Sequence, residues 1–155
     1  MFSLTRAKTK DHPAIKKILA VLDLACERPD LHNFWVIKEH HRIVGCLKMD
    51  EFPEFIFLSS LGVSPDRQKR GIGGFALAEV SKLAQMVNKP IFLYTIIPDF
   101  FKKSGFQIYP TSHFQLPTSN PITLPQKSPA ECRWCNPAKC ITMVKFPNVA
   151  GLPKI

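Results

Sequence analysis

The most constraining feature of this sequence is a strand-like run joined to a helix-like run by a short basic loop. Residues 55–63 (FIFLSSLGV) are rich in aromatic and aliphatic side chains, as is typical of a buried strand. Residues 71–87 carry apolar side chains at helical spacing, and Pro90 follows just beyond their end. The chain is therefore expected to pass from a buried strand into an amphipathic helix through residues 64–70.

Periodicity elsewhere in the chain predicts an α+β fold around one mixed sheet. Helical spacing of apolar residues predicts a helix over 11–27, and a proline followed by a later glycine predicts a short helix over 98–103. Runs rich in β-branched and aromatic residues predict the remaining strands. These strands are expected over 33–38, 43–49, 91–96, 106–109 and 141–146.

Length and composition are those of one soluble domain. The chain has 155 residues, of which 45% are hydrophobic and 21% charged, as in a globular protein. We expect a core over about 2–110, a proline-rich connection over 110–129 and a cysteine-bearing segment over 130–146. No apolar run reaches the roughly 20 residues that cross a bilayer, and no secretory signal is evident. A cytoplasmic protein is therefore expected.

The loop before the predicted helix has the properties of an anion-binding site. Gly71, Gly73 and Gly74 lack a β-carbon, so a ligand can approach the backbone closely. Amides at a helix N-terminus have no intrahelical partner and favour negative charge. Nearby basic side chains, which include Lys69 and Arg70, add positive charge, and the net charge of +9 also attracts anions. A pyrophosphate fits these features, and a solvated glycine-rich turn is the alternative.

Two motifs in this part of the chain resemble those of the GNAT acetyltransferase superfamily. Residues 68–73 (QKRGIG) match its Gln/Arg-x-x-Gly-x-Gly/Ala signature, and residues 61–65 resemble the strand and turn that precede it. Residues 93–106 resemble its second motif, which ends in Gly-Phe. The likeness covers about 2–110. Within the superfamily, this second motif is similar to small N-acetylglutamate synthase-like enzymes.

The resemblance implies a GNAT-like domain with a twisted, mostly antiparallel mixed sheet flanked by helices. Acetyl-CoA would lie between two diverging strands, with its pantetheine arm on the earlier strand and its pyrophosphate on the loop. The implied activity is acetyl transfer to the primary amine of a small molecule, such as the amino acid glutamate. The residues expected to bind acetyl-CoA are Leu61, Val63, Gln68, Lys69, Arg70, Gly71, Ile72, Gly73, Gly74 and Phe101.

The sequence departs from the family pattern at both proton-transfer positions. Phe57 stands where many members carry a glutamate, and Phe101 stands where many carry a tyrosine. Phenylalanine cannot transfer a proton. Glu54 is a weak candidate for the general base, with a solvated strand-end charge as the favoured alternative. A non-catalytic CoA-binding module and a protein N-acetyltransferase are the alternative functions.

A cysteine cluster near the C-terminus raises a separate hypothesis. Cys132, Cys135 and Cys140 include a Cys-x-x-Cys pair that could bind a structural zinc ion, whereas three reduced thiols are the favoured reading. Together with the positive charge, this cluster motivates a nucleic-acid-binding alternative. That alternative is disfavoured because the aromatic residues fall in predicted buried strands. For the assembly of this chain, a homodimer is the hypothesis.

Overall fold

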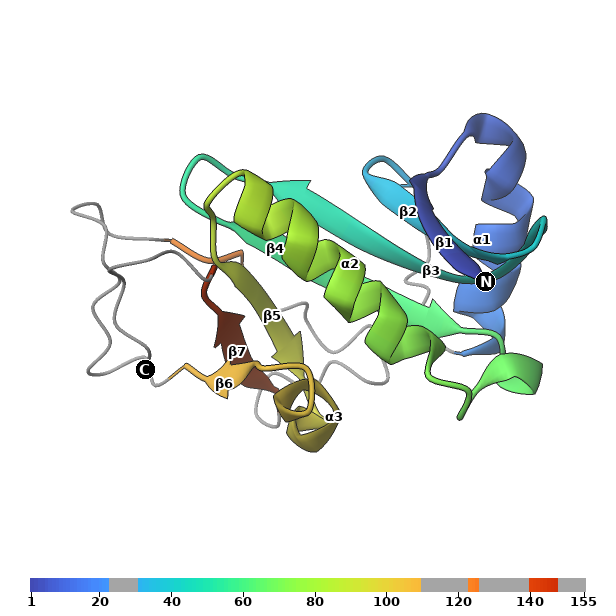
Figure 1. Ribbon diagram of the computed structural model, residues 1–155. Coiled ribbons are helices and arrows are strands. Elements are labelled where there is room, and N and C mark those ends of the chain that lie inside the picture. Colours follow the sequence, from blue (N-terminus) through green and yellow to red (C-terminus); the bar gives the residue numbers. More distant parts are fainter. Residues whose placement is uncertain (23–30, 110–122, 126–139, 148–155) are drawn as a thin grey trace.

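A mixed β-sheet with helices on both faces forms the described part of the chain (Figure 1). The computed structural model describes residues 1–22, 31–109, 123–125 and 140–147. The seven strands lie in the order β1-β2-β3-β4-β5-β7-β6. They are β1 (Phe2–Arg6), β2 (Phe34–Glu39), β3 (Arg42–Glu51), β4 (Ile56–Val63), β5 (Ile91–Thr95), β6 (Gln107–Ile108) and β7 (Ile141–Lys145). The helices are η1 (Thr9–Asp11), α1 (His12–Val21), η2 (Pro65–Arg67), α2 (Ile72–Met86) and α3 (Pro98–Lys102).

The predicted α+β class and the mixed sheet are confirmed, and each predicted strand is present with ends shifted by a few residues. Strand β1 was missed, because five residues with little burial carry no strong periodicity. Pairing with β2, from Phe2 opposite Glu39 to Arg6 opposite Trp35, forms it. The helix predicted over 11–27 ends at Val21, and residues 23–27 lie outside the described residues.

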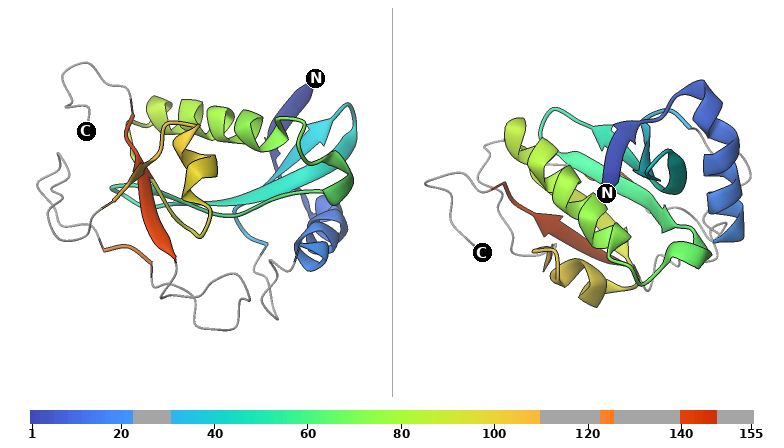
Figure 2. Two further views of the ribbon diagram at one scale, coloured as in Figure 1. Left: turned by 90° about the horizontal axis from the view of Figure 1, so that it is seen from below. Right: turned by 45° about the vertical axis from the view of Figure 1, so that its right-hand side comes forward.

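The two longer helices cover opposite faces of the sheet (Figure 2). Leu77 and Val80 of α2 pack in one cluster with Leu58 of β4 and Leu93 of β5. On the other face, α1 packs its buried side chains against β2 and β3. That second cluster contains Ile15, Ile18, Leu19, Phe34, Val36 and Cys46. A third cluster lies over β4, β5 and β7, on the face opposite α2, and contains Phe55, Phe57, Phe92 and Val144.

The thiol of Cys46 is fully buried in the α1 cluster, and it donates to the carbonyl oxygen of Ser60 at a sulfur–oxygen distance of 3.8 Å. Burial raises the pKa of Cys46 to about 12. Because the thiolate is the reactive form, we expect Cys46 to resist alkylation by iodoacetamide at pH 8 in the folded protein. Mass spectrometry should find it modified only after denaturation. Labelling as fast as in the unfolded chain would contradict the burial.

Strands β4 and β5 diverge soon after they meet. They pair in parallel at two positions, Ile56 with Ile91 and Phe57 with Phe92. Beyond Phe57, β4 continues beside β3 alone, while β5 pairs with β7. An irregularity opposite Cys46–Lys48 adds to the bend of β4, and Ser60 there has φ of 53°. The later half of β4 therefore has no strand partner on its β5 side within the described residues.

Candidate functional site

The loop between β4 and α2 places free amides at the end of the diverging strands. Lys69 and Gly71 both have left-handed backbone angles, with φ of 64° and 79°. Gly71 is the N-cap of α2, and its carbonyl oxygen accepts from the amide of Phe75 at 2.9 Å. The amides at the start of α2, from Ile72 to Gly74, are among those that a helix leaves unpaired. They form the type of helix N-terminus that binds anions.

The glycines of this loop have different roles. A β-carbon on Gly71 or Gly74 would meet nothing within 4 Å, so both positions border open space. A β-carbon on Gly73 would lie 2.8 Å from Cζ of Phe100, which belongs to α3. Gly73 therefore allows α2 and α3 to pack closely, a reason the motif alone did not suggest. Gly71 is required for its backbone angle, and Gly74 leaves the helix end accessible.

Two arginines of the loop are held by one carboxylate. Glu39, the last residue of β2, accepts from Nη1 of Arg67 at 3.0 Å and from Nη2 of Arg70 at 3.2 Å. The Glu39 side chain is only 14% exposed. Nε2 of Gln68 donates to the carbonyl oxygen of Val63 at 3.1 Å. Three of the four consecutive side chains from 67 to 70 thus fasten the loop to the sheet.

Lys69 is the loop cation whose ammonium makes no ion pair with another described residue. The positive charges of Arg67 and Arg70 are partly compensated by Glu39, so less of the positive charge expected at this loop is available to a ligand. Sequence reasoning missed Glu39. Its only local signal was an acidic residue at the end of a strand, before the turn at His40, which has φ of 56°.

If the loop binds the pyrophosphate of CoA, as the sequence resemblance implies, replacing Glu39 with glutamine should loosen the loop and weaken CoA binding by about tenfold, because a left-handed non-glycine residue such as Lys69 needs support from its surroundings. Hydrogen exchange of amides 68–74 should become faster, and titration calorimetry with CoA should give the affinity. Glu79→Gln removes a carboxylate that pairs with Lys82 on the surface of α2 and serves as control. Tighter CoA binding by the Glu39 variant would mean that Glu39 competes with phosphate instead.

The structure buries both phenylalanines that stand at the usual proton-transfer positions. Phe57 is 8% exposed, and its ring centroid lies 5.0 Å from that of Tyr94. Phe101 is also 8% exposed and packs edge-on against Phe106. The hydroxyl of Tyr94 donates to the backbone carbonyl of Pro125, and burial raises the pKa of Tyr94 above its usual value.

Glu54, the weak candidate for the base, lies in the turn before β4. The loop that begins α2 follows the opposite end of the same strand. At about 3.3 Å per residue, the length of β4 separates the two. Glu54 therefore lies away from the amides of residues 68–74, near the end of β4 that contains Phe57, and its role as base stays a prediction.

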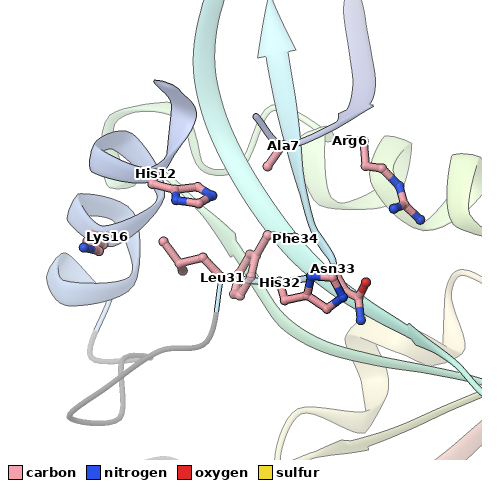
Figure 3. Close-up of a pocket in the computed structure, with 8 residues that line it drawn as sticks. All are labelled: Arg6, Ala7, His12, Lys16, Leu31, His32, Asn33 and Phe34. Carbon is pink, nitrogen blue, oxygen red and sulfur yellow. The ribbon is translucent and has the colours of Figure 1, made fainter. Parts of the chain in front are cut away.

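A cavity of about 550 Å³ lies between α1 and the beginning of β2 (Figure 3). Phe34 lines it and begins β2, whereas Glu39 ends β2 at the loop, so the cavity lies toward the other end of that strand. Among the described residues that line the cavity, none is acidic. Its lining residues are Arg6, Ala7, His12, Lys16, Leu31, His32, Asn33 and Phe34. Sequence reasoning missed it because the lining comes from two separate segments of the chain.

The proposed zinc site is not tested by this structure. Cys132 and Cys135 lie outside the described residues, and Cys140 directly precedes β7. Within the described ranges, no group of three histidine, cysteine or acidic residues could hold a metal ion. Also within these ranges, none of the helices has the length and apolar character needed to cross a membrane.

A mixed sheet with two diverging strands and a basic loop at a helix N-terminus characterises a class of acyl-CoA-dependent transferases, and the sequence comparison agrees. The profile of the GNAT acetyltransferase domain matches residues 30–108, slightly more than half of the chain. This chain belongs to the GNAT acetyltransferase family. A comparison with curated proteins found no significant match.

Several solved structures share this fold. N-acetylglutamate synthase from Neisseria gonorrhoeae, complexed with coenzyme A and N-acetylglutamate, is similar with a TM-score of 0.71 and 18% identity, over 96% of this chain and 36% of that chain. Rv2747 from Mycobacterium tuberculosis, in complex with CoA and NLQ, has a TM-score of 0.67 and 19% identity, over 93% and 98%. Arabidopsis thaliana Naa50, in complex with the bisubstrate analogue CoA-Ac-MVNAL, has a TM-score of 0.65 and 17% identity, over 93% and 97%.

These likenesses concern the fold, because all three identities are below 20%. The present chain spans about a third of the length of the Neisseria synthase. Two of the three structures, by contrast, are matched over nearly their whole length. These three structures hold different molecules besides or joined to CoA, namely N-acetylglutamate, NLQ and the analogue CoA-Ac-MVNAL, so the fold by itself does not select an acceptor.

Proposed function

We propose that this chain transfers the acetyl group of acetyl-CoA to the primary amine of a small molecule. The observation that carries the proposal is the divergence of β4 from β5 directly before the basic loop and the N-terminus of α2. The loop amides and Lys69 would bind the pyrophosphate. The pantetheine arm, which contains amide groups, would lie along the unpaired edge of β4, as an added strand does.

This arrangement assigns separate roles to the proposed cofactor-binding residues. Leu61 and Val63 belong to the part of β4 that lies beyond its pairing with β5. The carbonyl oxygen of Val63 already accepts from Gln68, so a pantetheine amide at that position would share or displace this bond. Phe101, buried in α3 against Phe106, would support the wall of the gap by packing alone.

The cavity beside α1 supports a small acceptor that carries an anionic group, with an amino acid such as glutamate as the favoured example. Arg6, Lys16 and two histidines line it, and the described part of its lining contains no carboxylate. Such a lining raises the local concentration of acidic small molecules. A synthase complexed with N-acetylglutamate is among the structures that share this fold, and it motivates glutamate as the first acceptor to test.

Release of free CoA thiol from acetyl-CoA tests the proposal. The purified chain is mixed with acetyl-CoA and a panel that contains glutamate, aspartate, glutamine, lysine and a peptide with a free N-terminus. Thiol release that depends on the chain and is fastest with the acidic amino acids is expected. Release with the peptide alone would indicate a protein N-acetyltransferase. Absence of release with every amine would contradict the proposed activity.

A non-catalytic CoA-binding module is the second candidate function, and Phe57 and Phe101 are the observations that favour it. Neither side chain can move a proton, and both are buried against other aromatic rings. For such a module, CoA should raise the melting temperature of the chain while acetyl-CoA remains intact with every amine. Turnover with any amine would exclude it.

A further inference from the structure

We propose that Asp50 on β3 is the base that takes the proton from the acceptor amine. This inference rests on the proposed acetyltransferase function. Many family members carry a glutamate at the position of Phe57 on β4, and in this chain Asp50 on the neighbouring strand would take over its role. Four observations support it: strand register, position relative to the gap, the contacts of the carboxylate, and its connection to the basic cavity.

The register of β3 and β4 places Asp50 directly opposite Phe57. Residues opposite each other in an antiparallel pair share one face, with Cβ atoms about 4.5–5.5 Å apart. The neighbouring pair, Met49 and Leu58, packs into the core under α2. Because side chains alternate along a strand, Asp50 and Phe57 face the opposite side of the sheet. Asp50 therefore lies one strand away from Phe57, the position at which many family members carry a glutamate.

Asp50 also lies at the level where the gap opens. Phe57 is the last residue of β4 that pairs with β5, through Phe92. A cofactor whose pyrophosphate binds at the loop after Val63 would extend its pantetheine arm back along β4, toward Phe57. Its thioester end would therefore approach the row of the sheet that contains Phe57 and Asp50.

The Asp50 carboxylate is oriented and remains reachable from solvent. Its Oδ1 accepts from Nδ2 of Asn33 at 3.0 Å, and its Oδ2 lies 3.8 Å from Nζ of Lys48. The Asp50 side chain is 28% exposed. The hydrogen bond from Asn33 orients the carboxylate, while its exposed part can pass a proton to water. A general base needs both properties.

Asn33 connects this carboxylate to the basic cavity. It lines the cavity and also contacts Asp50 (Figure 3 shows it beside His32). Phe34, which also lines the cavity, lies opposite Lys48, and Lys48 lies opposite Ser59 of β4. These three residues form one row across β2, β3 and β4, and the row leads from the cavity toward the gap between β4 and β5. An acceptor held in the cavity by an anionic group can direct its amine toward Asp50.

The proposed step balances in atoms and charge. The ammonium form of the acceptor gives a proton to Asp50, directly or through one water, and its nitrogen lone pair then attacks the thioester carbonyl carbon. The new C–N bond forms, the C–S bond breaks, and the sulfur leaves with the bonding electron pair. The second proton from nitrogen neutralises this thiolate, and Asp50 releases its proton to solvent. The products are the N-acetyl compound, CoA thiol and one proton.

Asp50→Asn is the decisive variant, and Glu51→Gln is the matched control. Glu51 is the next residue on β3 and pairs with Lys89 at 2.7 Å. For Asp50→Asn, kcat should fall by about 10²–10⁴-fold, the usual contribution of a general base, while the calorimetric Kd for acetyl-CoA should stay within about twofold. Glu51→Gln should keep kcat within about threefold of the unchanged chain, because Glu51 alternates with Asp50 along β3 and lies on the other face of the sheet.

A pH series separates proton transfer from a purely structural role. The groups around Asp50 that can carry charge are Lys48, His32 beside Asn33, and Tyr94 beyond Phe57. In Asp50→Asn the rate should rise about tenfold per pH unit up to the acceptor amine pKa, because free amine then comes from solution. The unchanged chain should show a shallower rise.

The outcomes distinguish this inference from the proposed function. Acetyl-CoA binding with turnover that Asp50→Asn does not slow would overturn the role of Asp50 and leave the acetyltransferase function intact. A loss of kcat without the steep pH response would also overturn it. Acetyl-CoA binding without turnover in the unchanged chain would overturn the base and the transferase function but retain the cofactor site. Absence of acetyl-CoA binding would overturn the base, the transferase function and the cofactor site.

Discussion

Replacement of Gly71 by valine should weaken acetyl-CoA binding by about 100-fold, because each lost hydrogen bond to a charged phosphate is worth about 1.5–3 kcal/mol. Gly71 has φ of 79° and is the N-cap of α2. A β-branched residue is strained in this left-handed region. Relief of that strain requires the loop to change its backbone angles, which would turn the amides of Ile72 and Gly73 away from the pyrophosphate. Titration calorimetry with acetyl-CoA measures the effect.

Gly71→Asn is the matched control for this prediction. Asparagine adopts left-handed angles far more readily than valine, and a β-carbon at this position meets nothing within 4 Å. The asparagine variant should therefore bind within about tenfold of the unchanged chain. An unchanged affinity in the valine variant would show that the loop amides do not bind the diphosphate. Equal losses in both variants would assign the effect to the added side chain.

Replacement of Phe92 by alanine should lower the free energy of unfolding by about 3–5 kcal/mol, the usual cost of removing a buried phenylalanine. Phe92 is fully buried, and its ring contacts Phe55 and Tyr109 edge-on at 5.6 and 5.2 Å. It also pairs with Phe57 at the point where β4 and β5 separate. Denaturant unfolding followed by circular dichroism gives the change in free energy.

Phe52→Ala provides the comparison for Phe92, because Phe52 also contacts Phe55 but is 37% exposed. Its replacement should cost about 1 kcal/mol or less, since a side chain that is already partly solvated loses less on truncation. Similar losses for both variants would mean that Phe92 does not anchor this cluster. A Phe92 variant that remains stable but loses acetyl-CoA affinity would place its role in the geometry of the gap.

Local patterns predicted most of the secondary structure, and the exceptions have physical reasons. Residues 55–63 and 71–87 carried strong apolar periodicity, and the structure places β4 and α2 there with small shifts at the ends. Strand β1 has little burial and depends on its partner β2, so its short sequence did not reveal it. The glycine pattern correctly located the start of α2, and the structure adds that Gly73 lies in close contact with the ring of Phe100.

The sequence by itself determined the class of the fold and the position of the loop between β4 and α2. Apolar periodicity, glycine positions and helix N-termini each depend on only a few neighbouring residues. Only the tertiary structure decided which side chains support that loop and which residues surround Asp50. Glu39 lies 28 residues from Arg67, and Asn33 lies 17 residues from Asp50. Strand register brings these pairs together, and register follows from the packing of the whole sheet rather than from any local pattern.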